Sequence, residues 1–200
     1  MANLDIVKNA IAAGTKELIR EKTIDKITVT AICEKAGLNR RNFYRYFQDK
    51  YEVIEWIYFH DHLFVNERYE GWSFWDYFPR IAQSLYNDKR FYLNAFKDES
   101  QNCFRKYCID RLFEVLDPDF RRDFPSAELE RFYVEHVCNM AFDSFVIWLS
   151  AEPCMPPDKF VALFRQLFLK NAETQLRLLT RPPMDSAERK DYVPQEPAKK

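Results

Sequence analysis

The chain has 200 residues, of which 47% are hydrophobic and 16% aromatic, so it can bury a sizeable core and is not a disordered protein. Its net charge of −1 is unevenly divided, because residues 1–50 hold ten Lys/Arg against six Asp/Glu and the remaining 150 hold 20 against 25. A basic segment joined to a mildly acidic body indicates a nucleic-acid-binding module with a separate second function, although excess charge on a small domain can also serve solubility alone.

Several classes of protein are disfavoured. No apolar run approaches the roughly 20 residues of a membrane span, and the N-terminus lacks the apolar region of a signal peptide, so we expect a cytoplasmic protein with no membrane partner. The five cysteines are scattered, which fits neither a disulfide framework nor a zinc ribbon. Two histidines, His60 and His62, flank Asp61, but on a helix they point about 200° apart and do not chelate together. Since no catalytic or phosphate-binding motif is present, we expect no enzyme activity, no cofactor and no metal site.

The chain is expected to be all-α. It has only three glycines, no alternating apolar and polar runs, and long stretches with a period of 3.6 residues. A first helix is predicted to begin at Asn3 or Asp5, and its apolar residues should cover the back of the helices that follow. These apolar residues are Ile6, Ala10, Ala13, Leu18 and Ile19.

Two short helices are predicted within residues 28–47. Thr28 is a good N-cap for a helix that runs to about Ala36, and Asn39 is a good N-cap for the second helix. Gly37 lies between them, where a left-handed residue commonly ends a helix. Two short helices joined by a glycine-containing turn are typical of a helix-turn-helix.

The second short helix is expected to present a polar face. Phe43 and Phe47 lie four residues apart and are expected to point inward. A rotation of about 100° per residue then places Arg41 and Arg45 outermost. The side chains beside them are those of Asn42 and Tyr44. Arginine can make a bidentate contact to guanine, asparagine to adenine, and a tyrosine hydroxyl can hold a phosphate, so this face suits a major groove.

The next helix is predicted to begin after Asp49, its N-cap, with Glu52 in the capping-box position. Lys50 then lies in the first turn, where the helix dipole disfavours a cation. A nearby phosphate would explain a lysine at this position, so Lys50 is a candidate phosphate contact.

The run TVTAICEKAGLNRRNFYRYFQDKY, which begins at Thr28, resembles the DNA-binding domain of TetR/AcrR-type transcriptional regulators, whose pattern is roughly T-x-x-x-I-A-x-x-A-G-V-S-x-x-T-[LF]-Y-x-[HY]-F-x-[SD]-K. The form R-x-x-F-Y-x-Y-F-x-D-K-Y is most similar to the subgroup of dihydroxyacetone kinase operon regulators. The resemblance covers about the first quarter of the chain. It implies phosphate contacts from Thr28, Tyr44, Tyr46 and Lys50 and base contacts from Arg40, Arg41 and Asn42. With the exposed Arg45, these eight residues are the predicted DNA-binding set.

This sequence also departs from the family pattern. Glycine or proline often stands in place of Arg41 and threonine in place of Asn42, so the resemblance does not supply the operator sequence. Thr23 lies where many members have glycine after the first helix, so the loop there can differ in shape.

A long helix is predicted from Lys50 to about Glu70, and by resemblance it connects the DNA-binding domain to a second domain. Aromatic residues are dense between Trp56 and Phe96, as is typical both of an effector pocket and of an ordinary core. The candidate pocket residues are Trp56, Phe59, Tyr69, Trp75, Phe78, Tyr92, Phe96 and His136. A core or pocket-wall role is favoured for His136 over a ligand role, because it lies on an apolar stripe.

The last two predicted helices span residues 126–151 and about 157–180, and both are apolar on two sides. Such a helix must be buried on two sides. A second copy of the chain is the simplest cover, and two helices per subunit would form a four-helix interface, which is where the resembling family dimerises. The alternative is a helix buried wholly inside its own domain. Residues 181–200 are rich in proline and charge, and we expect them to be disordered.

The sequence therefore predicts an all-α protein of about nine helices in two domains. Residues 1–48 form a three-helix helix-turn-helix domain, and residues 49–180 a helical effector-binding and dimerisation domain. The expected function is that of a homodimeric transcriptional regulator that binds a palindromic operator in double-stranded DNA, most simply a repressor controlled by a small-molecule effector. The alternative is a regulator, either a repressor or an activator, whose second domain responds to a protein partner. An exposed apolar patch outside the dimer interface and the lack of an enclosed cavity would favour this alternative.

Overall fold

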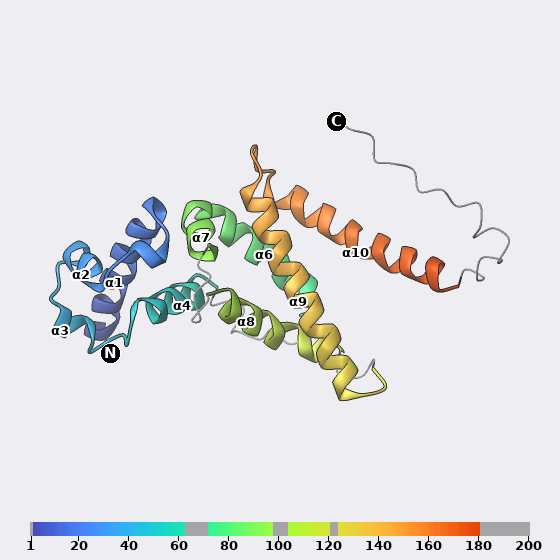
Figure 1. Ribbon diagram of the computed structural model, residues 1–200, viewed down its shortest axis with the longest axis horizontal. Coiled ribbons are helices and arrows are strands. Elements are labelled where there is room, and N and C mark those ends of the chain that lie inside the picture. The colour runs from blue at the N-terminus through green and yellow to red at the C-terminus, as the bar shows by residue number, and fades with distance from the viewer. Residues whose placement is uncertain (1, 63–71, 98–103, 121–123, 181–200) are drawn as a thin grey trace, which may run out of the picture. The chain divides into compact units, whose positions relative to one another are not determined.

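The computed structural model describes residues 2–62, 72–97, 104–120 and 124–180, and describes residues 2–5 and 117–120 by their backbone alone. All secondary structure in these ranges is helical, which confirms the predicted fold class (Figure 1). The α-helices are α1 (Ala2–Glu21), α2 (Val29–Ala36), α3 (Arg40–Phe43), α4 (Lys50–Asp61), α6 (Phe74–Asn87), α7 (Lys89–Phe96), α8 (Phe104–Phe120), α9 (Ala127–Ser150) and α10 (Pro157–Leu179), with one short 3₁₀ helix, η1 (Ile24–Lys26).

The chain divides into two compact units, Met1–Val161 and Ala162–Lys200. The first unit contains α1 to α9 and the first turn of α10. The expected second domain of residues 49–180 and the expected disorder after residue 180 stay predictions, and the tail lies outside the described residues. Among the helices of the described ranges, none has an apolar stretch long enough to cross a membrane.

The predicted starts of α2, α3 and α4 depend on local capping, and the structure confirms them. The Thr28 hydroxyl accepts a hydrogen bond from the Ala31 amide at 3.1 Å, and the Asn39 side chain accepts one from the Asn42 amide at 2.8 Å. Gly37 has a φ of +68°, so it is the left-handed residue that ends α2. Each cap satisfies backbone groups that a helix end leaves without an intrahelical partner. The long helix predicted from Lys50 to about Glu70 was wrong in its end, because α4 stops at Asp61 and His62 leaves the helical conformation; residues 63–71 lie outside the described residues.

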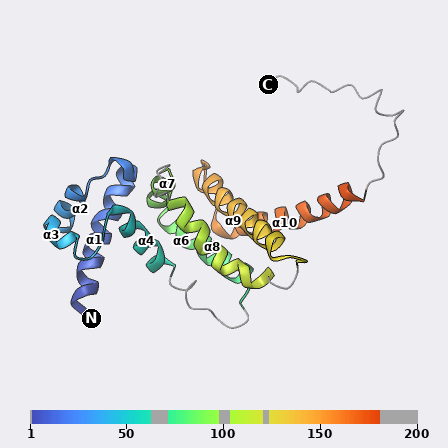
Figure 2. The same ribbon diagram turned by 60° about the horizontal axis from the view of Figure 1, so that its bottom comes forward.

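The inward face predicted for α1 was wrong in part. Ile6 is 65% exposed and Ala13 is also exposed, whereas Ile11 and Thr15 are fully buried. The reason is that α1 packs against α2, α4 and α7, so more than one side of it is covered. Figures 1 and 2 both show α7 beside the C-terminal half of α1. The buried residues of a helix that is covered on more than one side do not form a single apolar stripe.

The contact of α1 with α4 and α7 carries a network of charged and polar groups that we call the Asp61 junction, formed by Lys16, Arg20, Asp61, Asp88 and Tyr92. The Lys16 ammonium donates to both Asp61 carboxylate oxygens, at 3.0 and 2.7 Å, and the Tyr92 hydroxyl donates to the same carboxylate at 2.6 Å. Arg20 donates two hydrogen bonds to Asp88, at 2.8 and 2.6 Å. Because these groups lie on three helices, they fix α1 against α4 and α7.

The Tyr92 ring is buried, and burial raises the pKa of its hydroxyl well above the usual value. The hydroxyl therefore keeps its proton at neutral pH and remains a donor to Asp61.

We predict that Tyr92→Phe lowers the free energy of unfolding by about 1.5 kcal/mol, because a hydrogen bond to a partly buried carboxylate is lost while the ring is kept. Urea denaturation followed by circular dichroism measures this change. The matched control is Tyr86→Phe, whose ring stacks on Trp148, with centroids 5.9 Å apart. Equal urea midpoints for the two variants would contradict a stabilising role for the Tyr92 hydroxyl.

Candidate DNA-binding interface and effector cavity

The helix-turn-helix consists of α2, α3 and the turn between them. Phe43 is 0% exposed and Phe47 is 2% exposed, so these two rings anchor α3 and the turn after it to the core of the domain. After Phe43 the chain continues as a tight turn, in which the Tyr46 and Phe47 amides both donate to the Phe43 carbonyl. The regular part of the second helix is thus only four residues long.

The opposite face of α3 and the turn is cationic and open. Arg40, Arg41 and Arg45 are exposed, and Tyr44 is 50% exposed. The Arg40 guanidinium donates to the Tyr44 hydroxyl at 3.2 Å and lies over its ring. This contact orients both side chains outward. Three arginines on one open face can meet phosphates and guanine edges together.

The remaining predicted contacts surround this face. Asn42 and Tyr46 are half-buried, so only part of each side chain can reach a groove. Thr28 is exposed and uses its oxygen to cap α2, which leaves its hydroxyl proton free to donate to a phosphate. Seven of the eight predicted residues therefore lie on the helix-turn-helix with their side chains exposed or partly exposed.

Lys50 is the eighth predicted contact and lies differently. It is half-buried at the start of α4, and its ammonium donates to the carbonyls of Ile24, Ile27 and Asp25 at 2.8, 2.9 and 3.3 Å. These carbonyls explain a cation in the first turn of a helix without a phosphate. Its predicted phosphate contact stays a prediction.

A small cavity lies between α4, α6 and α8. It is lined by Tyr58, Phe59, His62, Ile81, Arg111, Leu112 and Val115. Its free volume holds about one water molecule. Effector pockets are usually far larger, in the range of about 300–1,000 Å³, so a ligand would have to widen this cavity.

Of the eight predicted pocket residues, Phe59 lines this cavity and the others that are described lie elsewhere. Trp56 stacks on His60, with ring centroids 3.7 Å apart, and Phe78 stacks on Phe145 at 4.8 Å. Trp75 packs on Phe74, and Phe96 on Phe104 and Phe142; Tyr92 belongs to the Asp61 junction. His136 is exposed on α9, which corrects its expected place in a core or pocket wall. Tyr69 lies outside the described residues.

Six of the seven residues that line this cavity were absent from the predicted pocket, and two of the six, His62 and Arg111, carry a basic group. His62 lies four residues after the buried Tyr58, so the helical period of α4 could have placed it inside. Arg111 lies on α8, and its guanidinium is near the Phe59 ring, 5.9 Å from the centroid. No local pattern indicated it, because the contact joins residues far apart in the chain. Within the described ranges, no group of three or more His, Cys, Asp or Glu side chains is arranged to hold a metal ion.

Burial lowers the pKa of His62 from 6.5 to about 4, since the charged imidazolium would lose its hydration. The unfolded chain therefore binds a proton at higher pH than the folded chain. We predict that the free energy of unfolding falls as the pH falls from about 6.5 to about 4, by up to about 3 kcal/mol from this group. Urea denaturation at a series of pH values measures this slope.

His62→Gln should reduce that acid-dependent loss, and His60→Gln serves as the control because His60 is exposed. The same pH slope in both variants and the wild type would show that His62 does not carry it.

Comparison with known proteins supports the assignment of a helix-turn-helix near the N-terminus. Residues 11–57 match the family of bacterial regulatory proteins named tetR. The HTH-type dhaKLM operon transcriptional activator DhaS of Lactococcus lactis is 24% identical over 147 residues, which cover 64% of this chain and 71% of that protein.

Solved structures share the fold. The dihydroxyacetone kinase operon activator DhaS superposes with a TM-score of 0.57 and 18% identity, over 84% of this chain and 97% of that one. NalD, the secondary repressor of the MexAB-OprM multidrug efflux pump in Pseudomonas aeruginosa, superposes with a TM-score of 0.65 and 17% identity, over 85% and 97% of the two chains. The expected resemblance is thus confirmed: residues 11–57, which contain the helix-turn-helix, match the bacterial regulatory proteins of the tetR family.

Proposed function

We propose that the chain is a DNA-binding transcriptional regulator that inserts α3 into the major groove. The observation that carries this proposal is the contrast between the two faces of α3 and the turn after it, where Phe43 and Phe47 are buried and Arg40, Arg41 and Arg45 are exposed. Base contacts are assigned to Arg40, Arg41 and Asn42, and phosphate contacts to Thr28, Tyr44 and Tyr46. Arg45 adds an exposed charge in the turn after α3, and Lys50 lies apart from this face, at the start of α4. Guanidinium and amide groups are those that read base edges in a major groove.

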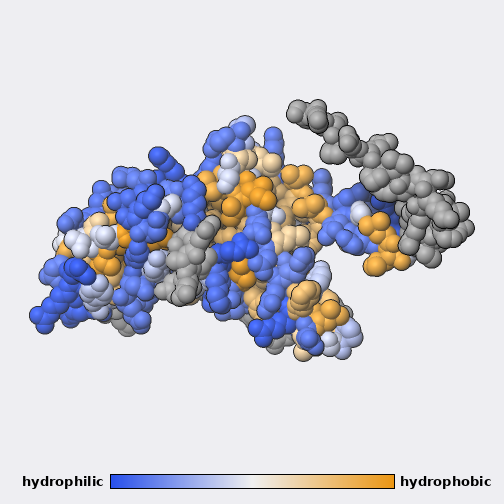
Figure 3. Space-filling view, in the orientation of Figure 1, coloured by the Kyte–Doolittle hydropathy of each residue, from blue (hydrophilic) through white to orange (hydrophobic). Residues whose placement is uncertain are grey.

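The regulator is proposed to act as a homodimer on a palindromic operator. On α9, Phe132 is 70% exposed and Ile147 is 72% exposed, and hydrophobic side chains gather at the lower end of this helix (Figure 3). Within the second unit, α10 exposes its own apolar side chains. These are Leu163, Leu167, Leu169, Leu176, Leu178 and Leu179. Apolar surface of this kind favours burial against a second copy, which would add a second α3 for the other half-site.

The proposed mode of action is repression that a small-molecule effector relieves. The cavity between α4, α6 and α8 supports this mode, because His62 lies at the end of α4 and Phe59 on the same helix. An effector that widened the cavity would displace α4, whose other end begins beside the helix-turn-helix. It could shift operator affinity only by its differential binding to the two conformations.

A second candidate is a regulator that responds to a protein partner. The close packing of the aromatic residues favours it, since the cavity between α4, α6 and α8 holds about one water molecule. The two solved relatives named above act with opposite sign, since DhaS is an operon activator and NalD is a repressor. Activation through a protein partner is therefore the alternative to ligand-relieved repression.

We predict that Arg41→Ala weakens binding to a selected duplex by about 1–3 kcal/mol and relaxes the base preference at one position, because a bidentate base contact is lost. Fluorescence anisotropy at two salt concentrations measures the affinity. The wild-type protein first selects the duplex from a random-sequence pool.

Arg90→Ala is the control for that measurement, because Arg90 is an exposed arginine on α7, outside the helix-turn-helix. Equal affinities for Arg41→Ala and Arg90→Ala would contradict the assignment of Arg41. Weak binding of the wild type to every duplex would contradict DNA recognition by this chain.

A variant that fills the cavity distinguishes control by a small-molecule effector from control by a protein partner. Val115→Phe places a larger side chain in the cavity, and we expect this variant to bind DNA as the wild type does but to lose release by the low-molecular-mass fraction of a host-cell extract. Lys106→Phe is the control, since Lys106 is exposed on the same helix and does not line the cavity. Release of all three proteins by the macromolecular fraction alone would favour the protein partner.

A further inference from the structure

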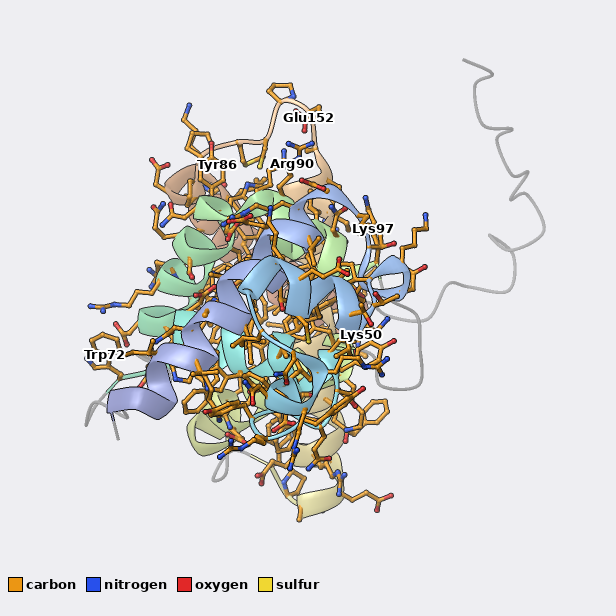
Figure 4. The ribbon with its side chains drawn as sticks, turned by 90° about the vertical axis from the view of Figure 1, so that its left-hand side faces the viewer. Lys50, Trp72, Tyr86, Arg90, Lys97 and Glu152 are labelled. Carbon is orange, nitrogen blue, oxygen red and sulfur yellow. The ribbon has the colours of Figure 1, made fainter. Side chains whose placement is uncertain are left out.

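Lys50 joins the beginning of α4 to the loop that precedes α2. Its ammonium group has three N–H donors, and three backbone carbonyls accept from it: Ile24 at 2.8 Å, Ile27 at 2.9 Å and Asp25 at 3.3 Å. Figure 4 shows Lys50 beside this loop, on the side of the molecule that carries the helix-turn-helix. These contacts span 23 to 26 positions in the sequence, so they are tertiary and not a local turn.

The carbonyls belong to Ile24 and Asp25, the first two residues of the short helix η1, and to Ile27, the residue after it. The Ile24 carbonyl also accepts from the Ile27 amide at 3.0 Å, and its second lone pair can accept from Lys50. Lys50 therefore supplies further donors and a positive charge to a group of carbonyl oxygens. This gain offsets the unfavourable position of the same lysine in the first turn of α4.

The carbonyls that accept from Lys50 lie next to a proposed DNA contact. Ile27 directly precedes Thr28, the N-cap of α2 and a proposed phosphate contact. The Ile24 and Ile27 side chains are buried, at 0% and 1% exposed, so their backbone is also fixed from the inside. The first residue of α4 thus holds the first residue of the helix-turn-helix in place.

We infer that Lys50 is a positioning residue for DNA binding, which acts by tying the start of α4 to the η1–α2 loop and so placing Thr28 against the phosphate backbone. This inference rests on the proposed DNA-binding function. Its ammonium donors are used within the chain, so Lys50 contributes through the loop and not as a phosphate contact of its own. A displacement of α4 is then transmitted to α2 as well as to α3.

The test uses Lys50→Arg in the full-length chain, because arginine keeps the positive charge and binds phosphate well. Its planar guanidinium cannot direct three donors onto three carbonyls that surround a single point. We expect about tenfold weaker binding to the duplex that the wild type selects, which corresponds to the loss of about one charged hydrogen bond. We also expect faster amide hydrogen exchange over residues 28–32. Lys26→Arg, an exposed lysine in the same loop, is the matched control and should leave both measurements unchanged.

Lys50→Met provides the second readout, the slope of log affinity against log salt. A lost phosphate contact reduces this slope by about 0.9, whereas a lost positioning contact lowers affinity at an unchanged slope. Wild-type affinity and exchange in Lys50→Arg, or a slope reduced by about 0.9 in Lys50→Met relative to Lys26→Met, would overturn the inference.

The exchange measurement separates this inference from the proposed function. If the wild type binds no duplex while Lys50→Arg still loosens residues 28–32, the DNA-binding proposal fails and the tie between α4 and the loop stands. A loss of helix content throughout the chain in both variants would show a general folding role and would overturn the local one.

Discussion

The carboxylate of Asp61 is the point on which the arrangement of the first unit depends. It accepts from Lys16 of α1 and from Tyr92 of α7, and it lies at the last residue of α4. Three helices therefore meet at one negative charge, which is partly buried and has its donors in place. Because α1 also covers α2, a change at α7 reaches the helix-turn-helix through α1 as well as through α4. A signal that moves α4 must therefore also keep or break the hydrogen bonds that join Asp61 to Lys16 of α1.

Features determined by neighbouring residues could be predicted from the sequence. The caps at Thr28, Asn39 and Asp49, the left-handed Gly37 and the inward Phe43 and Phe47 all follow from spacings of one to four residues. Such signals act within one turn of helix, where the chain geometry leaves few alternatives. The all-α class and the exposed arginines of α3 follow from the same local periodicity.

Features that join distant residues could not be predicted in this way. Lys16 and Asp61 are 45 positions apart, and Lys50 reaches carbonyls that carry no side-chain identity at all. The candidate pocket failed for a related reason: aromatic rings such as Phe78 and Phe96 have the same periodicity whether they line a cavity or pack on other rings. Ile6 on α1 was expected to be covered and is exposed, because the neighbours of a helix decide which of its sides are buried.

The brevity of α3 limits how much of an operator one copy can specify. Four helical residues present about one turn to a groove, which is enough to address about three base pairs. With four distinguishable pairs at each position, such a triplet recurs by chance about once in 64 positions. A bacterial genome offers on the order of a million competing sites, so one α3 would be distributed over tens of thousands of them. When two copies bind at a fixed separation, both triplets must match, so the probability of a chance site is the product of the two. A signal that altered only the separation would leave each copy able to match one triplet at a time, and the number of competing sites would rise to that of a single copy.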